Sequence, residues 1–85
     1  IEKNLFASNK NLVFLNLAKN VLKKIQYFYF RNLFKLELLI LSFNLIIDIE
    51  NQSFSNLINL VELDLKLNKF SIIKSYYFSN LVNLK

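Results

Sequence analysis

The stretch that decides the fold is LELLILSFNLIIDIENQSFSNLIN, residues 36–59. Its first fourteen residues are the most apolar part of the chain, and alone they fit a membrane span, a buried helix or a buried strand. The same spacing of leucine and asparagine returns before and after this stretch. Because an internal repeat overrides the local interpretation of any one copy, the period of the chain decides between these alternatives.

The chain repeats every 24 residues. LVFLNLAKNVLKKIQYFYFRNLFK (12–35) and LVELDLKLNKFSIIKSYYFSNLVN (60–83) align with the middle copy without a gap. A period of 24 fits neither a heptad nor a hendecad, so a coiled coil is disfavoured. The columns identical in all three copies are Leu12/Leu36/Leu60, Leu15/Leu39/Leu63, Leu17/Leu41/Leu65, Asn20/Asn44/Asn68, Ile25/Ile49/Ile73, Phe30/Phe54/Phe78, Asn32/Asn56/Asn80 and Leu33/Leu57/Leu81.

Each column has a physical reason. Leu15 and Leu17 lie two residues apart, so they point to the same side of a short strand, and stacked copies would form a parallel sheet with a leucine face. Parallel strands need a long crossover, and we expect Ile25, Phe30, Leu33 and their equivalents to pack back from it. The asparagines Asn20, Asn44 and Asn68 fall where the chain leaves the strand. Because a buried amide without partners is costly, we expect them to form a structural ladder of hydrogen bonds to turn backbone.

The pattern LxxLxLxxNxLxxIxxxxFxNL resembles the leucine-rich repeat family, specifically the 24-residue class common in Toll-like and related ectodomains. The resemblance implies an α/β fold: a segment of a horseshoe-shaped solenoid, with a parallel β-sheet on the concave face and irregular or short helical convex segments. It covers essentially the whole chain, as a partial unit (1–11), repeats 12–35, 36–59 and 60–83, and the start of another repeat (84–85). We therefore expect a piece of a longer solenoid.

Two departures from the family pattern carry expectations of their own. The family usually has small residues just before the phenylalanine column, whereas this chain has Phe28-Tyr29, Gln52-Ser53 and Tyr76-Tyr77. We expect this bulk to change the convex backbone path and to leave aromatic side chains exposed. Since the chain has no glycine, we also expect positive φ angles to fall on Asn or Asp.

The amino-acid composition limits the kinds of chemical site that the chain can form. The chain has 18 Leu, 13 Asn and 10 Lys but no Gly, Pro, Cys or His, which indicates an A+T-rich coding sequence. Seven of its cations and one acid lie in residues 1–35, against four cations and five acids in 36–85. This asymmetry could steer an anionic partner to one end, but solvated lysines from biased codons are the favoured interpretation. Without Cys or His, thiol chemistry, disulfides and most transition-metal sites are excluded.

The resemblance places binding residues at the variable positions beside the strand leucines. We interpret Phe14, Leu38, Ile40 and Phe43 as an apolar anchor. Glu62 and Asp64 would form its polar rim, while biased codons filling exposed sites are an equal alternative. A catalytic carboxylate dyad or a calcium site at the rim is disfavoured, because no base, nucleophile or further oxygen ligands surround it. The predicted concave-face ligand-binding residues are Phe14, Asn16, Leu38, Ile40, Phe43, Glu62, Asp64 and Lys66.

The expected function is a non-catalytic scaffold for protein–protein or ligand recognition in a receptor-type ectodomain, extracellular or at the cell surface. An intracellular leucine-rich repeat interaction scaffold and a gene fragment without independent function remain alternatives. We expect a protein or apolar ligand, no cofactor, no metal, no nucleic acid and no membrane contact by this segment. Asn51 opens an Asn-x-Ser triplet that could carry a glycan in a secreted parent, although a chance match is favoured.

Overall fold

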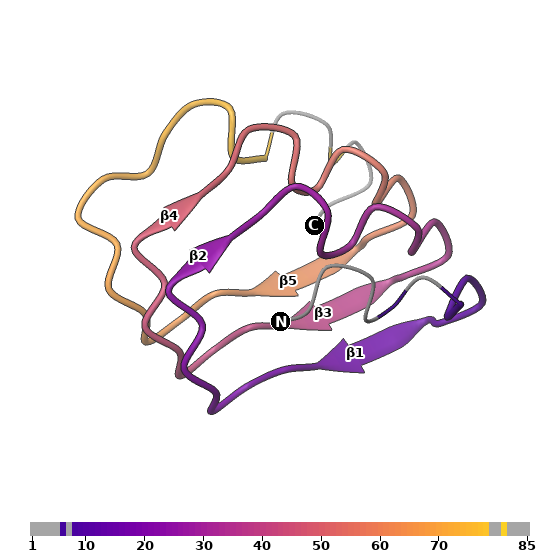
Figure 1. Ribbon diagram of the computed structural model, residues 1–85, viewed down its shortest axis with the longest axis horizontal. Coiled ribbons are helices and arrows are strands. Elements are labelled where there is room, and N and C mark those ends of the chain that lie inside the picture. Colours follow the sequence, from indigo (N-terminus) through magenta and orange to yellow (C-terminus); the bar gives the residue numbers. More distant parts are fainter. Residues whose placement is uncertain (1–5, 7, 79–80, 82–85) are drawn as a thin grey trace.

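The chain winds through three stacked coils, and each coil contributes one strand to a parallel sheet (Figure 1). The computed structural model describes residue 6, residues 8–78 and residue 81. Strands β1 (Phe14–Asn16), β3 (Leu38–Ile40) and β5 (Glu62–Asp64) lie in the order β1-β3-β5. Paired residues differ by 24 in number, so that Leu15, Leu39 and Leu63 stand in register. The sheet therefore has the period of the sequence.

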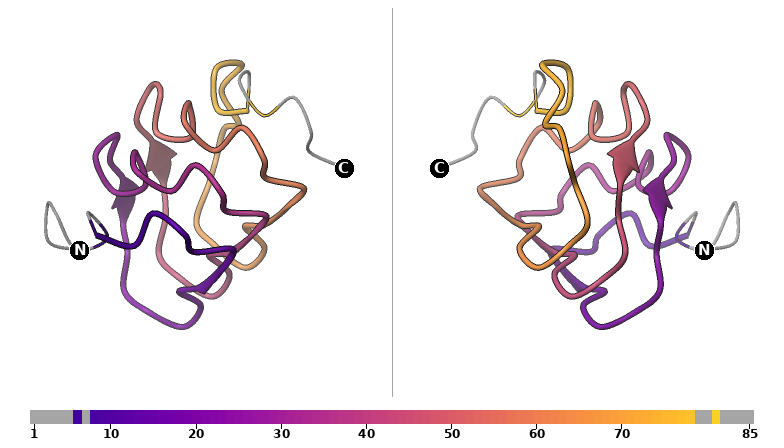
Figure 2. Two further views of the ribbon diagram at one scale, coloured as in Figure 1. Left: turned by 90° about the vertical axis from the view of Figure 1, so that its right-hand side faces the viewer. Right: turned by 90° about the vertical axis from the view of Figure 1, so that its left-hand side faces the viewer.

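The return path of each coil is irregular. Two short strands, β2 (Lys24–Ile25) and β4 (Asp48–Ile49), form a second parallel pair, and turns complete the coils, which lie side by side in the two views of Figure 2. The described residues contain no helix, and hence none that could cross a membrane. The parallel sheet and the irregular convex segments predicted from the sequence are confirmed.

The core lies mainly in the middle coil. Because successive side chains of a strand point to opposite faces, Leu39 is fully buried while Leu38 and Ile40 on either side of it are half-buried. Each fully buried aliphatic side chain contributes roughly 1.5–3 kcal/mol relative to an exposed one. Other fully buried residues of this coil are Leu36, Leu41, Ile46 and Leu57.

The phenylalanine column forms a stack along the solenoid. The Phe6 and Phe30 ring centroids lie 6.3 Å apart with an interplanar angle of 21°, and those of Phe30 and Phe54 lie 6.2 Å apart at 22°. Both pairs are within the range where aromatic rings attract each other. The repeat period is thus also visible in the aromatic side chains of the convex half.

The expectation of exposed aromatics before this column is wrong, since Phe28 and Tyr76 are partly buried against the core. Tyr29 and Tyr77 are buried, and Tyr77 packs against Phe70 with ring centroids 5.8 Å apart. Ser53 occupies the same column in the middle coil and is also buried, with its hydroxyl donating to the carbonyl of Glu50 at 2.6 Å. The bulk is accommodated because these side chains turn into the interior instead of toward solvent.

A second expectation, that the whole isoleucine column packs inward, is wrong at Ile73. Ile25 and Ile49 are buried, whereas Ile73 is 58% exposed and belongs to no strand. The interior of the third coil is filled instead by the buried Tyr77 ring, which packs on Phe70. The second sheet therefore ends at β4 within the described part of the chain.

The buried asparagine of the middle coil links neighbouring coils. Asn44 is only 3% exposed, and its Nδ2 donates to the carbonyls of Leu17 (3.1 Å), Leu41 (3.0 Å) and Ser42 (3.2 Å). Its Oδ1 accepts a hydrogen bond from the Leu22 N–H at 3.1 Å. One side chain therefore satisfies backbone groups of both its own turn and the preceding turn, which offsets the cost of burying the amide.

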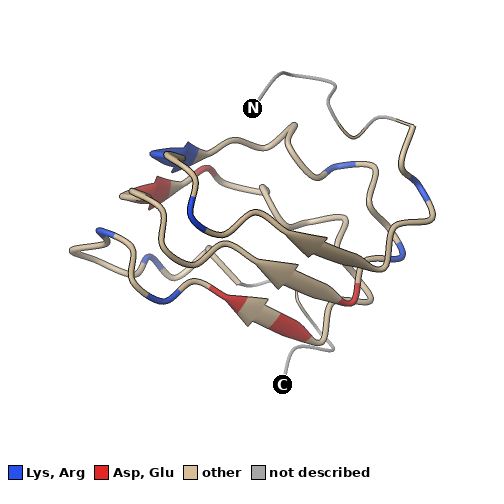
Figure 3. Cartoon of the chain, turned by 90° about the horizontal axis from the view of Figure 1, so that it is seen from below, with Lys and Arg blue, Asp and Glu red and all other residues tan. Residues whose placement is uncertain are grey.

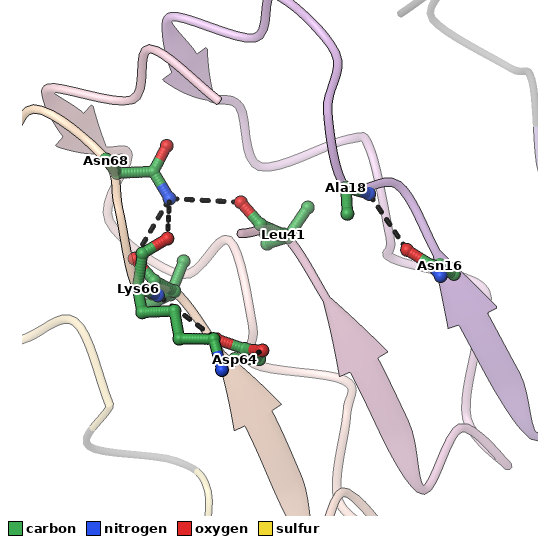
Figure 4. Close-up of polar contacts among 7 residues, drawn as sticks. Asn16, Ala18, Leu41, Asp64, Lys66 and Asn68 are labelled. Carbon is green, nitrogen blue, oxygen red and sulfur yellow. Dashed lines mark hydrogen bonds and ion pairs between the residues drawn. The ribbon is translucent and has the colours of Figure 1, made fainter. Parts of the chain in front are cut away.

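The third coil repeats this arrangement. Asn68 Nδ2 donates to the carbonyls of Leu41 (3.0 Å, Figure 4) and Leu65 (2.9 Å), and its Oδ1 accepts from the Ile46 N–H at 3.0 Å. In the first coil the exposed Asn20 donates to the carbonyl of Leu17 at 2.8 Å. Together these bonds form a ladder that runs along the turns after β1, β3 and β5.

The residue before each ladder asparagine adopts a left-handed backbone conformation. The φ angles are 60° at Lys19, 56° at Phe43 and 58° at Leu67, and Gln52 on the convex side has 66°. The expectation that Asn or Asp would take these positions is wrong. The ladder asparagines must point inward to make their bonds, so the left-handed position passes to the preceding residue, whose side chain is exposed and avoids steric conflict with the core. Such a conformation costs about 1–3 kcal/mol per residue.

We predict that Asn44→Ala destabilises the protein by about 2–4 kcal/mol, because it leaves buried backbone groups without partners. Asn20→Ala is the matched control and should cost about 1 kcal/mol or less, because Asn20 is exposed and bonds only within its own turn. Urea unfolding followed by circular dichroism measures both values. Equal losses in the two variants would show that the ladder between coils does not contribute to stability.

Candidate functional site on the concave sheet

The solvent-facing side of the sheet brings together residues from all three coils. Strand pairing places six of the predicted binding residues in two rows that run across the strands. These rows are Phe14–Leu38–Glu62 at the strand starts and Asn16–Ile40–Asp64 at the strand ends.

The chemistry changes along each row. Phe14 is exposed on β1, Leu38 and Ile40 are half-buried on β3, and Glu62 on β5 is exposed. An apolar centre on the first two strands thus meets a carboxylate on the third. Figure 3 shows both acidic positions of β5 beside the uncharged middle strand.

The polar residues of the second row also shape the turns that follow them. The Ala18 N–H donates to Asn16 Oδ1 at 2.9 Å, and the Lys66 N–H donates to Asp64 Oδ1 at 3.1 Å (Figure 4). These contacts are Asx turns, in which a side chain bonds its own backbone two residues on. Ile40 has no side-chain oxygen that could accept such a bond. In the second row, the middle strand alone therefore presents an aliphatic side chain. The structural role of Asn16 was missed in the sequence, although its Asn-x-x pattern at a turn is a usable signal.

Two predicted residues lie just beyond the strands. Lys66 is exposed and its Nζ lies 3.8 Å from Asp64 Oδ2, a contact too exposed to add much stability. Phe43 is exposed, and Lys19 Nζ lies 5.9 Å from the centre of its ring, within cation–π distance. Lys19 was not among the predicted binding residues, because the contact depends on how neighbouring turns stack.

The predicted glycosylation site lies on another part of the solenoid. Asn51 is exposed in the convex turn after β4, away from the sheet rows. The hydroxyl of Ser53, two residues on, is buried and donates to the carbonyls of Ile25 and Glu50. A glycan on Asn51 would leave the concave face open.

The titratable groups whose pKa is clearly shifted cluster on the convex side. Tyr77 Oη donates to Asp48 Oδ1 at 2.6 Å, and Lys74 Nζ lies 3.2 Å from the same oxygen. The bond from Tyr77, aided by Lys74, lowers the pKa of the Asp48 carboxyl below 3.8. Burial, together with the bond to Asp48, raises the pKa of Tyr77 above 10.0, and Asp48 also raises that of Lys74. The cluster joins the second coil to the third and lies outside the concave rows.

One hollow is present at the first coil, with a volume of about 550 Å³. Leu17, Leu22 and Tyr29 line it together with Val21 and Lys23. In the second coil the residues equivalent to Leu17 and Leu22 are fully buried against the first coil. The hollow is therefore the outer side of a repeat, and Asn20, Lys24 and Gln26 also line it. No cluster of metal-binding side chains occurs among the described residues.

We predict that the Asp48 cluster makes stability pH-dependent at both extremes. A lowered pKa in the folded state means that the Asp48 contribution is present above pH 3.8 and is lost as the pH falls through the folded-state pKa. The raised pKa of Tyr77 means that its contribution is lost as the pH rises above 10.0. Tyr77→Phe should cost roughly 1.5–3 kcal/mol at neutral pH, as expected for a hydrogen bond to a charged group, and should flatten the alkaline loss. Unfolding free energies across pH that are identical for the two proteins would contradict this role.

Comparison with known proteins agrees with this architecture. The family model described as "Leucine rich repeat" matches residues 34–85. A crystal structure of a TLR13–ssRNA13 complex superposes with a TM-score of 0.92 and 39% identity over 99% of this chain. This chain spans only 12% of the TLR13 chain. No curated protein matches the sequence.

Two consequences follow from the comparisons. The TLR13 protein was crystallised with single-stranded RNA, so this match does not support the expectation that nucleic acid is absent among the partners. The matched residues include two of the three 24-residue units, and the structural similarity extends over all three. The chain belongs to the leucine-rich repeat family.

Proposed function

We propose that the chain is a recognition segment that binds a protein partner through the concave sheet. The observation that carries the proposal is the middle strand, where Leu39 is fully buried while Leu38 and Ile40 face the other way. The core is complete without these two side chains. Their apolar character is therefore available for a ligand, and burial of such anchors supplies most of the affinity in protein interfaces.

The charge beside this apolar centre indicates what a partner would carry. Glu62 is exposed next to Leu38, and Asp64 stands next to Ile40 with Lys66 3.8 Å away. A basic residue flanking an apolar anchor would therefore be favoured by electrostatic complementarity. Glu62 is the stronger candidate for this contact, because Asp64 already accepts a bond from the turn after β5.

The wider context proposed for this segment is a receptor-type ectodomain. The 24-residue repeat and the 39% identity to the TLR13 structure support this context, although the chain covers only 12% of that protein. An intracellular interaction scaffold is the alternative, and the flanking sequence of the parent gene distinguishes the two. Leucine-rich repeat proteins are typically non-catalytic scaffolds, and the concave rows hold no nucleophile paired with a base.

Single-stranded RNA is a second candidate ligand, because the similar TLR13 structure contains it. Binding of RNA relies on cationic contacts to phosphate, usually with aromatic stacking. The concave rows instead place two carboxylates, Glu62 and Asp64, beside an aliphatic strand. This distribution of charge favours a protein ligand over RNA.

We predict that Leu38→Lys with Ile40→Lys abolishes binding of peptides selected against the chain from a display library. The loss should exceed about tenfold in Kd, because both side chains lie at the centre of the proposed interface. Phe34→Lys is the control, since Phe34 is exposed in a turn outside the sheet. Fluorescence anisotropy measures each Kd. The concave proposal fails if the control and the double variant weaken binding equally.

We predict only weak binding of a fluorescently labelled single-stranded RNA oligonucleotide, and we expect it to disappear at raised salt because it would rest on non-specific phosphate contacts. Glu62→Gln should strengthen this binding by removing a repulsive carboxylate near the sheet. Tight binding that persists at raised salt and is lost in the double variant at residues 38 and 40 would instead identify RNA as the ligand of the concave face.

A further inference from the structure

The turns that leave the sheet form a continuous edge of the solenoid, which we call the exit rim and define as residues 17–23, 41–47 and 65–71. Adjacent turns are fixed to each other through backbone bonds. The Lys19 N–H donates to the carbonyl of Ser42 at 3.0 Å, and the Leu45 N–H donates to the carbonyl of Leu22 at 2.9 Å. The rim is therefore as regular as the sheet, although it contains no strand.

The middle turn of the rim exposes apolar side chains at alternate positions. Asn44 and Ile46 are buried, whereas Phe43, Leu45 and Ile47 are exposed, and Ile47 is 61% exposed. Burial therefore alternates along residues 43–47, with Phe43 itself in the left-handed conformation. Three large apolar residues thus project in a row from the edge of the molecule.

The turns on either side add lysine to this row. The first turn exposes Lys19, Val21 (76% exposed) and Lys23, and the third exposes Leu67 (60% exposed) and Lys69. The three turns contain four lysines and no Asp or Glu. Figure 3 shows cationic positions along the edge where the strands end.

The nearest carboxylates have partners of their own. Asp64 Oδ2 lies 3.8 Å from Lys66 Nζ, and Asp48 accepts from Tyr77 and lies 3.2 Å from Lys74. Lys19, Lys23 and Lys69 therefore give the rim its positive charge around the apolar row.

We infer that the exit rim is a docking surface for the headgroup region of a membrane that contains anionic lipid. A row of projecting Phe, Leu and Ile flanked by lysines matches what an anionic membrane surface offers, namely apolar burial at the acyl boundary and attraction by negative headgroups. Such contact needs no membrane-spanning helix. The inference departs from the expectation of no membrane contact by this segment, because the sequence alone does not reveal which turn residues project.

A lipid surface suits the rim better than a protein does. Lysine is depleted in protein interfaces but is attracted by anionic headgroups, so the lysines around the exposed apolar side chains favour a lipid surface. Strand addition is disfavoured, because Phe43, Leu45 and Ile47 already donate their N–H groups to neighbouring turns.

The opposite edge of the sheet lacks this combination. Exposed Val13, Phe34 and Val61 are interspersed there with the acidic Glu37, and Lys35 Nζ is bonded to Asn11 Oδ1 at 3.0 Å. Its apolar side chains are therefore divided by polar contacts and by the charges of Lys10, Lys35 and Glu37, so this edge has a smaller net positive charge than the rim. This edge supplies a matched control.

The test is cosedimentation of the 85-residue chain with vesicles of phosphatidylcholine alone or mixed with phosphatidylserine. We expect binding to the mixed vesicles that weakens with salt, and little binding to phosphatidylcholine. Leu45→Ser with Ile47→Ser should abolish it, and Lys19→Gln with Lys23→Gln should weaken it by about fivefold for each lysine removed. These residues are exposed, and unchanged circular dichroism will verify that each variant is folded.

Val13→Ser with Val61→Ser is the control and should bind as the parent chain does, since both residues lie on the opposite edge. The inference is overturned if the control loses as much binding as the Leu45/Ile47 variant, or if the two kinds of vesicle bind equally. Binding of an acidic amphipathic peptide to the rim without any vesicle binding would also overturn it, by identifying a protein partner. Because the concave residues Leu38 and Ile40 are unchanged in all these variants, failure here leaves the concave proposal open.

Discussion

The buried amide of Asn44 is the interaction on which the rest of the structure depends. It is placed among leucines, where an unsatisfied amide would cost several kcal/mol, and it is tolerated because both of its ends bond backbone of two adjacent turns. Those bonds set the spacing between coils at the point where each strand ends. They also require the preceding residue to adopt a left-handed conformation and to point outward. A single constraint therefore determines the stacking of the coils and the display of Phe43 at the surface.

Regular stacking turns the sequence columns into surface rows. Because each column contributes one residue per coil, the chemistry of a row changes only where the sequence of one repeat differs from the next. In the second row this gives Asn16, Ile40 and Asp64, of which the outer two also cap their own turns. In the middle repeat, therefore, the side chain of this row makes no hydrogen bond to the turn that follows it. The middle coil also has the most fully buried leucines. The coil with the most core packing therefore carries the most apolar concave surface.

The fold could be predicted because it rests on the spacing of identical columns, and spacing is a property of the sequence. The incorrect predictions concern positions where residues of two different columns could fill the same structural role. Lys19, Phe43 and Leu67 adopt the left-handed conformation, because the ladder asparagines must point into the interior to make their hydrogen bonds. Ile73 is exposed, and the buried Tyr77 occupies the interior instead, where its ring packs on Phe70 and its hydroxyl bonds Asp48. Neither outcome is visible from a column taken alone.

The residues of the candidate site were predicted as a set, but their second roles were not. The Asx turns of Asn16 and Asp64 and the contact of Lys19 with the Phe43 ring depend on the path of the turns. The exit rim escaped prediction for the same reason, since the side chains that project from a turn become apparent only when the path of its backbone is known.

Phe43 belongs to both proposed surfaces, because it lies three residues after the end of β3 and begins the apolar row of the middle turn. This shared position has a geometric consequence. A partner that extends along the concave rows past Ile40 would approach the rim at Phe43, where Lys19 already lies 5.9 Å from the ring. A rim held at an anionic membrane would then confine such a partner to the lipid surface. The two surfaces are thus separable by mutation at Leu38 and Ile47, which lie on different elements, while Phe43 alone couples them.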